Sequence, residues 1–140
     1  MARTYLITGG AGGIGKATAE LLTSRGHKAI TADIANADIN ADLTTVEGRQ
    51  QLIEQATELS GGTLDGVVAN AGMQAPTPKT AQVNYFGAVA TLEGLRPLLE
   101  KSDAPRAVVT ASIASLQPAD DKLVDAMLAG DEDATVKRGQ

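Results

Sequence analysis

Short apolar runs alternate with amphipathic segments along most of the chain. The runs at 4–8, 28–33, 64–70 and 106–111, with a short extended piece at 38–40, have the length and composition of strands. Between them, apolar side chains recur at helical spacing in 14–22, 46–59 and 80–99. This alternation predicts an α/β fold, a doubly wound parallel sheet of the Rossmann type with helices on both faces. The carboxyl ends of such strands share one edge, where ligands bind.

The ends of the predicted helices carry local signals. Gly26 stands where the residue after a helix belongs, and Thr44 with Glu47 forms a capping box before the second helix. The third helix is apolar on two faces, so both faces should be covered, and its Pro97 predicts a kink or an early end. The strand at 106–111 would form a hydrophobic edge if no further strand pairs with it.

Composition narrows the possible functions. The 140 residues fit one domain. With no cysteine and only His27, the chain offers no disulfide framework, no thiol nucleophile and no cysteine or histidine metal site, and we expect no metal. The net charge of −5 argues against nucleic acid and membrane surfaces as partners. Without a signal peptide or an apolar run of spanning length, we expect a cytoplasmic protein.

Candidate chemistry begins in a glycine-rich turn. Residues 8–16 read T-G-G-A-G-G-I-G-K, between the first strand and the first helix. Glycines let the backbone approach a pyrophosphate, whose charge is stabilised by free N–H groups at a helix N-terminus. The spacing Gly10-x-Gly12-x-x-Gly15 matches the general dinucleotide pattern. The same letters come near a P-loop, the motif of a nucleotide phosphohydrolase, but Ala17 stands where that loop needs a magnesium-binding hydroxyl.

A more specific pattern covers residues 4–115. The segment 8–15 resembles the T-G-x-x-x-G-I-G signature of the short-chain dehydrogenase/reductase family, and Asn70-Ala71-Gly72 resembles its N-N-A-G motif, with Ala69 replacing the first Asn. Further positions match the family in the right order: Asp33, Asp42-Leu43, Asn84 and Ser112. Within the family, the stretches 32–34, 41–45 and 83–88 look most like the 3α-hydroxysteroid dehydrogenase/carbonyl reductase branch.

The resemblance implies a cofactor site and a cofactor. The residues it assigns to cofactor binding are Gly9, Gly12, Gly13, Ile14, Gly15, Asp33, Ile34, Asp42, Leu43, Asn70, Ala71 and Gly72. The carboxylate of Asp33 would accept hydrogen bonds from ribose hydroxyls and repel a 2′-phosphate. Relatives that prefer NADP carry a basic residue at the position of Gly12 or just after the second strand, where this chain has Ile34 and Ala35. We therefore predict NAD.

The resemblance also implies a reaction. Ser112 would hydrogen-bond the substrate oxygen and Asn84 would hold a proton relay, during hydride transfer between NAD and a secondary alcohol or ketone. The Tyr-x-x-x-Lys pair of the family is absent, because the fourth residues after Tyr5 and Tyr85 are Gly9 and Val89. We expect the N-terminal portion of an NAD-dependent oxidoreductase, inactive alone. The alternatives are a stand-alone, non-catalytic NAD-binding module and a P-loop-like phosphohydrolase.

The acidity is concentrated near the end of the sequence. Residues 119–133 carry the whole net charge of −5. Their apolar positions predict a helix that Asp120 or Asp121 caps and Gly130 ends, within an acidic helical insertion at about 116–135. It is either a solvated surface helix or a lid near Ser112. The expected partners are a small-molecule alcohol or ketone and, by the same resemblance, a second copy bound through the helix at 80–99.

Overall fold

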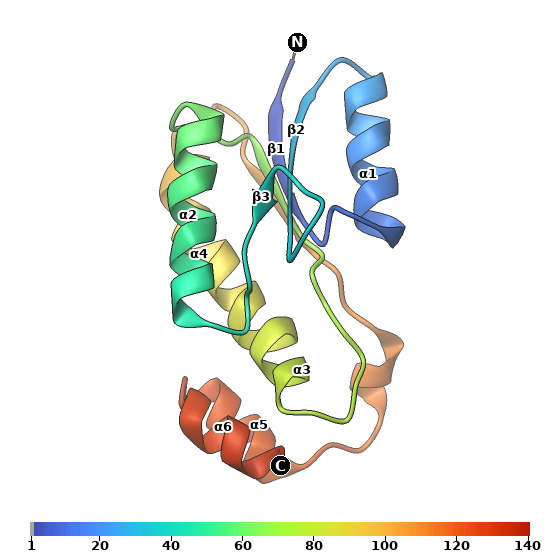
Figure 1. Ribbon diagram of the computed structural model, residues 1–140, viewed down its shortest axis with the longest axis vertical. Coiled ribbons are helices and arrows are strands. Elements are labelled where there is room, and N and C mark those ends of the chain that lie inside the picture. The colour runs from blue at the N-terminus through green and yellow to red at the C-terminus, as the bar shows by residue number, and fades with distance from the viewer. Residues whose placement is uncertain (1) are drawn as a thin grey trace.

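Parallel strands form a central five-stranded sheet in the computed structural model, which describes residues 2–140 (Figure 1). Leu6 of the first strand pairs with Ile30 on one side and Val67 on the other. The predicted doubly wound parallel fold is confirmed, and the carboxyl ends of the strands lie along one edge. Across the sheet the strands are β3 (Ile39–Asn40), β2 (Lys28–Asp33), β1 (Thr4–Thr8), β4 (Gly66–Ala69) and β5 (Arg106–Val109).

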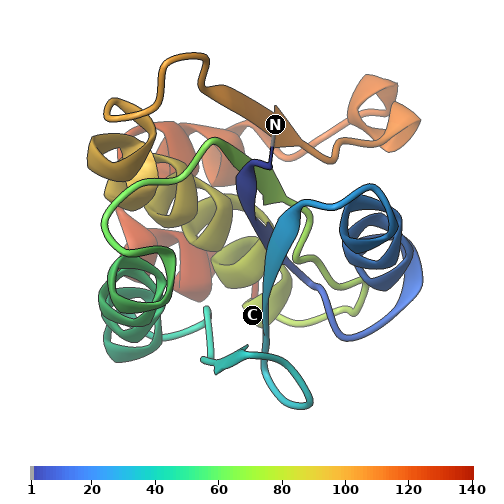
Figure 2. The same cartoon turned by 90° about the horizontal axis from the view of Figure 1, so that it is seen from above.

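Helices cover both faces of the sheet. Figure 2 shows α1 (Gly13–Ser24) on one face, with α2 (Val46–Ser60) and α4 (Ala88–Leu99) on the other. One long helix begins as α3 (Lys79–Ala81), passes through the π-helical segment η1 (Gln82–Gly87) and continues as α4. The remaining elements follow β5: the 3₁₀ turn η2 (Ile113–Leu116), α5 (Asp121–Leu128) and α6 (Glu132–Arg138).

The main hydrophobic core lies between the sheet and the α2–α4 layer. Leu52 of α2 and Leu95 of α4 are completely buried there against Leu6, Ile30 and Val67 of the strands. Removing such side chains from water stabilises the fold by about 25 cal/mol per Å² of apolar surface. This core fixes α2 and α4 on the sheet, and with them the loops that leave the carboxyl edge.

One of the helix-end predictions was wrong. The N-cap of α2 is Thr45, whose hydroxyl accepts the Gly48 N–H, because the Thr44 hydroxyl instead donates to the carboxylate of Asp42. The long helix does not end early at Pro97, since α4 runs on to Leu99. The proline stands in the last turn, where its missing N–H removes only one bond of the helix.

The hydrophobic edge strand and the acidic helix that the sequence predicts are both present. β5 is an exposed edge, with Val108 at 57% and Val109 at 48% of full exposure. Gly130 lies after α5, as predicted, but a second helix, α6, follows it and packs against α3 and η1 (Figure 1). The first half of the long helix is therefore covered by α6. None of the helices in residues 2–140 has the length and apolarity to cross a membrane.

Candidate functional site

The glycine-rich turn joins β1 to α1 at the carboxyl edge of the sheet. Thr8, which is 2% exposed, accepts hydrogen bonds on its hydroxyl from the N–H groups of Asn70 and Ala71, both at 3.0 Å. These bonds hold the ends of β1 and β4 together. Gly9 has φ +69°, and a Cβ there would lie 3.0 Å from the Cα of Ala71. The turn therefore needs glycine at this position.

The start of α1 is free of local partners for its N–H groups. Gly12 caps the helix without a side-chain hydrogen bond, and no acidic side chain occupies the first turn. A Cβ on Gly15 would overlap the Gly9 carbonyl and approach the Asn70 amide, so this glycine lets the helix pack against the turn. A Cβ on Gly12, in contrast, would meet nothing within 4 Å. Free N–H groups and the positive end of the helix dipole suit an anion.

Asp33 ends β2 beside this turn. Its Oδ2 accepts the N–H of Ala11 at 3.1 Å, and its Oδ1 accepts the N–H of Ile34 at 2.8 Å. These two bonds fix the carboxylate between the glycine turn and the residue after the strand. Asp33 is the only acidic residue of β2 (Lys28–Asp33).

Asp42 follows β3, the strand that lies next to β2 in the sheet. Its carboxylate accepts hydrogen bonds from the hydroxyl of Thr44 at 2.7 Å and from the N–H of Thr44 at 2.9 Å. These two bonds, the hydroxyl first, lower the pKa of Asp42, and the positive charges of Lys79 and Arg49 lower it further. Asp42 is therefore a carboxylate at neutral pH, held in one orientation.

A cavity of about 640 Å³ opens between these groups. Its wall contains every residue assigned to the cofactor by the sequence except Gly15. It also contains residues that the sequence reasoning missed, among them Lys79, the only basic residue of the described lining. Lys79 follows a proline-containing loop, and none of the sequence motifs that predict the cofactor site includes it. The missed lining residues are Ala32, Ala41, Thr44, Leu52, Met73, Lys79 and Val83.

Neither residue assigned to catalysis belongs to the described wall of this cavity. The side-chain amide of Asn84 is occupied by Met73, since its Oδ1 accepts the Met73 N–H at 2.8 Å and its Nδ2 donates to the Met73 carbonyl at 2.9 Å. Asn84 thus supports the wall, which includes Met73. Ser112 is exposed and caps η2, accepting the N–H of Ala114 at 3.1 Å. Their catalytic roles remain predictions.

The part of the chain that the structure describes contains no group of three or more histidine, cysteine or acidic residues placed to hold a metal ion.

A family model described as short chain dehydrogenase matches residues 3–124. The chain belongs to the short-chain dehydrogenase family. The resemblance stated from the motifs is thus confirmed, and the glycine turn follows the pattern of this family.

One curated relative agrees with the resemblance to the hydroxysteroid dehydrogenase branch. Over 132 residues the chain is 40% identical to the 3α-hydroxysteroid dehydrogenase/carbonyl reductase of Comamonas testosteroni, covering 91% of this chain and 51% of that protein. Levodione reductase of Leifsonia aquatica is 28% identical, with 82% of this chain and 54% of that protein covered. The chain spans about half the length of these curated relatives.

A solved structure matches the fold closely. The 3α-hydroxysteroid dehydrogenase of Pseudomonas sp. B-0831, complexed with NADH, superposes with a TM-score of 0.93 at 42% identity. The match covers 97% of this chain and 56% of that one. Nearly the whole of this chain thus shares its fold with part of a relative whose structure contains NADH.

Proposed function

We propose that the 640 Å³ cavity binds NAD(H). The observation that carries the proposal is that the free N-terminus of α1 and the carboxylate of Asp33 face the same cavity. The first suits a pyrophosphate and the second suits the hydroxyls of a ribose. The volume lies within the range of roughly 300–1,000 Å³ that is usual for small-molecule sites.

The residues of the site also fit the group in shape. Around Gly12 an added Cβ would meet open space, so a phosphate can approach the backbone closely there. Gly12, Gly13 and Ile14 would bind the pyrophosphate through their backbone, and Asp33 with Ile34 would hold the adenosine ribose. Asp42 and Leu43 would line the adenine side, and Asn70 to Gly72 would lie along the rest of the cofactor.

The charge of the site favours NAD(H) over NADP(H). A 2′-phosphate would face the carboxylate of Asp33, and like charges at such short range repel strongly. Gly12, Ile34 and Ala35, where a compensating base would be placed, are uncharged. The similar dehydrogenase of Pseudomonas sp. B-0831, whose structure contains NADH, supports the same choice.

The reaction we propose is the interconversion of a secondary alcohol and a ketone. When bound, NAD(H) supplies the hydride acceptor or donor for it. Ser112 would donate a hydrogen bond to the substrate oxygen, and Asn84 would keep the Met73 backbone in place beside the cofactor. The similar protein of Comamonas testosteroni, which is named as a hydroxysteroid dehydrogenase and carbonyl reductase, supports this class of substrate. The acid–base pair of the reaction has no counterpart among these 140 residues, so we expect the chain to bind cofactor without turning it over.

Calorimetric titration of the 140-residue chain tests the cofactor assignment. We expect saturable binding of NADH at one site per chain, weaker binding of NADPH and no binding of ATP with magnesium. Binding of ATP with magnesium but not of NADH would overturn the proposal in favour of a phosphohydrolase. Oxidation of a secondary alcohol by the isolated chain, followed as NADH absorbance, would show that the acid–base group lies within these residues after all.

A further inference from the structure

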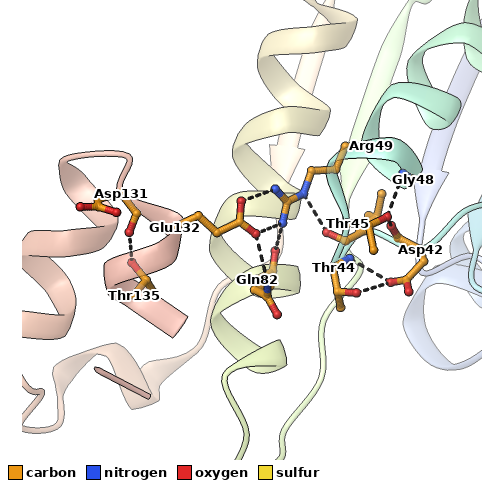
Figure 3. Close-up of polar contacts among 10 residues, drawn as sticks. Asp42, Thr44, Thr45, Gly48, Arg49, Gln82, Asp131, Glu132 and Thr135 are labelled. Carbon is orange, nitrogen blue, oxygen red and sulfur yellow. Dashed lines mark hydrogen bonds and ion pairs between the residues drawn. The ribbon is translucent and has the colours of Figure 1, made fainter. Parts of the chain in front are cut away.

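A buried arginine joins segments that lie far apart in the sequence. Arg49, in the first turn of α2, is 8% exposed. Its two terminal nitrogens donate to the two carboxylate oxygens of Glu132 in α6, at 2.8 and 2.9 Å. Its Nε donates to the Leu43 carbonyl at 2.8 Å. Its Nη2 donates to the Gln82 carbonyl at 3.2 Å (Figure 3). The guanidinium thus binds three separate elements at once.

Two of these contacts reach the wall of the cofactor cavity. Leu43 lines the cavity together with its neighbours Asp42 and Thr44, and Val83, the residue after Gln82, lines it as well. Arg49 therefore fixes the loop between β3 and α2 against the start of η1 from behind. Each contact is made to a backbone carbonyl, so it sets the path of the chain and not the orientation of one side chain.

The third contact supplies the charge that a buried guanidinium needs. Burying an ion costs several kcal/mol unless a counter-charge and hydrogen bonds compensate for it. Glu132 forms the only ion pair that the described residues give Arg49, and it is bidentate. Gln82 adds a bond from its side-chain amide to the same carboxylate, at 3.2 Å. The hydrogen bond from Arg49 lowers the pKa of Glu132 despite its partial burial.

Glu132 belongs to a unit that is held together by its own contacts. Arg138, at the end of α6, forms an ion pair at 2.7 Å with Asp120, the cap of α5. Asp131 caps α6 by accepting the N–H of Ala134 at 3.0 Å. Thr135 of α6 is completely buried. The α5–α6 pair can therefore dock or leave as one body, carrying Glu132 with it.

We propose that Glu132 is a positioning residue for cofactor binding, acting through Arg49 on the Leu43 loop. Docking of the α5–α6 pair and occupancy of the cavity are then coupled, and by thermodynamic linkage each stabilises the other. The proposal rests on the proposed binding of NAD(H). It gives the acidic segment a role at the edge of the adenine side of the cavity, and not as a lid over Ser112.

Substitution of Glu132 tests the link, with a matched control elsewhere in the chain. We expect Glu132→Gln to raise the Kd for NADH about tenfold, because the guanidinium loses its counter-charge and the loop loses its anchor. Glu100→Gln removes the same kind of partner from Arg96, in an ion pair whose side chains are 77% and 62% exposed. That variant should bind NADH as the unsubstituted chain does. Equal affinity of the chain and Glu132→Gln would overturn the proposal.

The coupling between NADH binding and docking of α5–α6 can also be measured from the other side, by its effect on α6. This measurement needs no variant, so a loss of stability caused by a substitution cannot explain its result. Saturating NADH should slow hydrogen exchange of the α6 amides of the unsubstituted chain, although α6 lies outside the cavity wall. Unchanged exchange there, with NADH bound, would contradict the coupling. If the unsubstituted chain does not bind NADH, the proposed function fails first.

Arg49→Lys keeps the positive charge but cannot donate two parallel hydrogen bonds to the Glu132 carboxylate. This variant should fold and bind NADH more weakly than the unsubstituted chain. Equal binding of NADH would again overturn the link.

Discussion

The carboxylate of Asp33 accepts a hydrogen bond from the backbone N–H of Ala11, at 3.1 Å. This bond ties the end of β2 to the glycine turn and places a negative charge in the wall of the cavity. The two features that the sequence marks most clearly, an acid after the second strand and a run of glycines after the first, are thus parts of one connected structure.

Asp33→Asn should change the cofactor preference without unfolding the protein. Asparagine keeps a carbonyl oxygen that can accept the Ala11 N–H, but it removes the charge that would repel a 2′-phosphate. We expect the ratio of NADPH affinity to NADH affinity to rise about tenfold. Calorimetric titration with both cofactors measures the ratio, and an unchanged ratio would show that Asp33 does not contact the adenosine ribose.

Gly12→Ala should weaken NADH binding without changing the stability of the fold. Gly12 has extended backbone angles and open space around a built Cβ, so the variant should keep its free energy of unfolding. The added methyl group would keep a pyrophosphate from the backbone, and the Kd for NADH should rise about tenfold. Gly15→Ala is the contrasting case, because its methyl group collides with the Gly9 carbonyl and should lower stability itself. Unaltered NADH affinity in Gly12→Ala would place the pyrophosphate elsewhere.

The core beneath the site can be tested through α4. Leu95 is completely buried between α4 and the sheet, and its truncation leaves a cavity. Leu95→Ala should lower the free energy of unfolding by about 2–5 kcal/mol in urea denaturation. Leu128→Ala, at a position 71% exposed in α5, should change it by less than about 0.5 kcal/mol. Similar losses in both variants would mean that α4 is not seated as described.

Asp65 should contribute to acid sensitivity. Its carboxylate accepts the Thr4 N–H and the Ser102 hydroxyl, both at 2.7 Å. The Thr4 bond first, and the Ser102 bond next, lower the pKa of Asp65 below its ordinary value of 3.8. The stabilisation is therefore complete above pH 3.8 and is lost as the pH falls through the lower, folded-state pKa.

The variant Asp65→Asn checks the sign of this dependence. Below pH 3.8 the unfolded carboxyl binds a proton before the folded one does, so the free energy of unfolding falls with pH. Unfolding measured across this range should show a shallower fall for Asp65→Asn than for the unsubstituted chain. Parallel curves would show that the Thr4 and Ser102 bonds do not favour the ionised form.

Local sequence was sufficient for the elements whose signals are local. The glycine turn, the apolar strands and the helix stop at Gly130 depend on residues close together in the chain. The capping residue of α2 depends on more, since either Thr44 or Thr45 could cap it, and the choice follows from the bond between Thr44 and Asp42. Only the folded loop shows which hydroxyl is free.

Other features depend on contacts between distant residues. The π-helical segment η1 includes Asn84, whose side-chain amide forms two hydrogen bonds with the backbone of Met73 in the preceding loop. The helix α6 begins at Glu132, which pairs with Arg49 across 83 positions of sequence. Lys79 reaches the cavity because of where α3 begins. Periodicity does not encode such pairings, and so the sequence predicted the acidic helix but neither its partner helix nor its docking site.

Amide correlation spectra of the 140-residue chain, recorded by NMR with and without NADH, test the location of the cofactor most directly. We expect the amide signals of residues 12–15, 33–34 and 70–72 to shift as NADH is added and to stop shifting when the site is filled. Spectra that do not change, or saturable shifts confined to residues away from the carboxyl edge of the sheet, would contradict the proposed binding site.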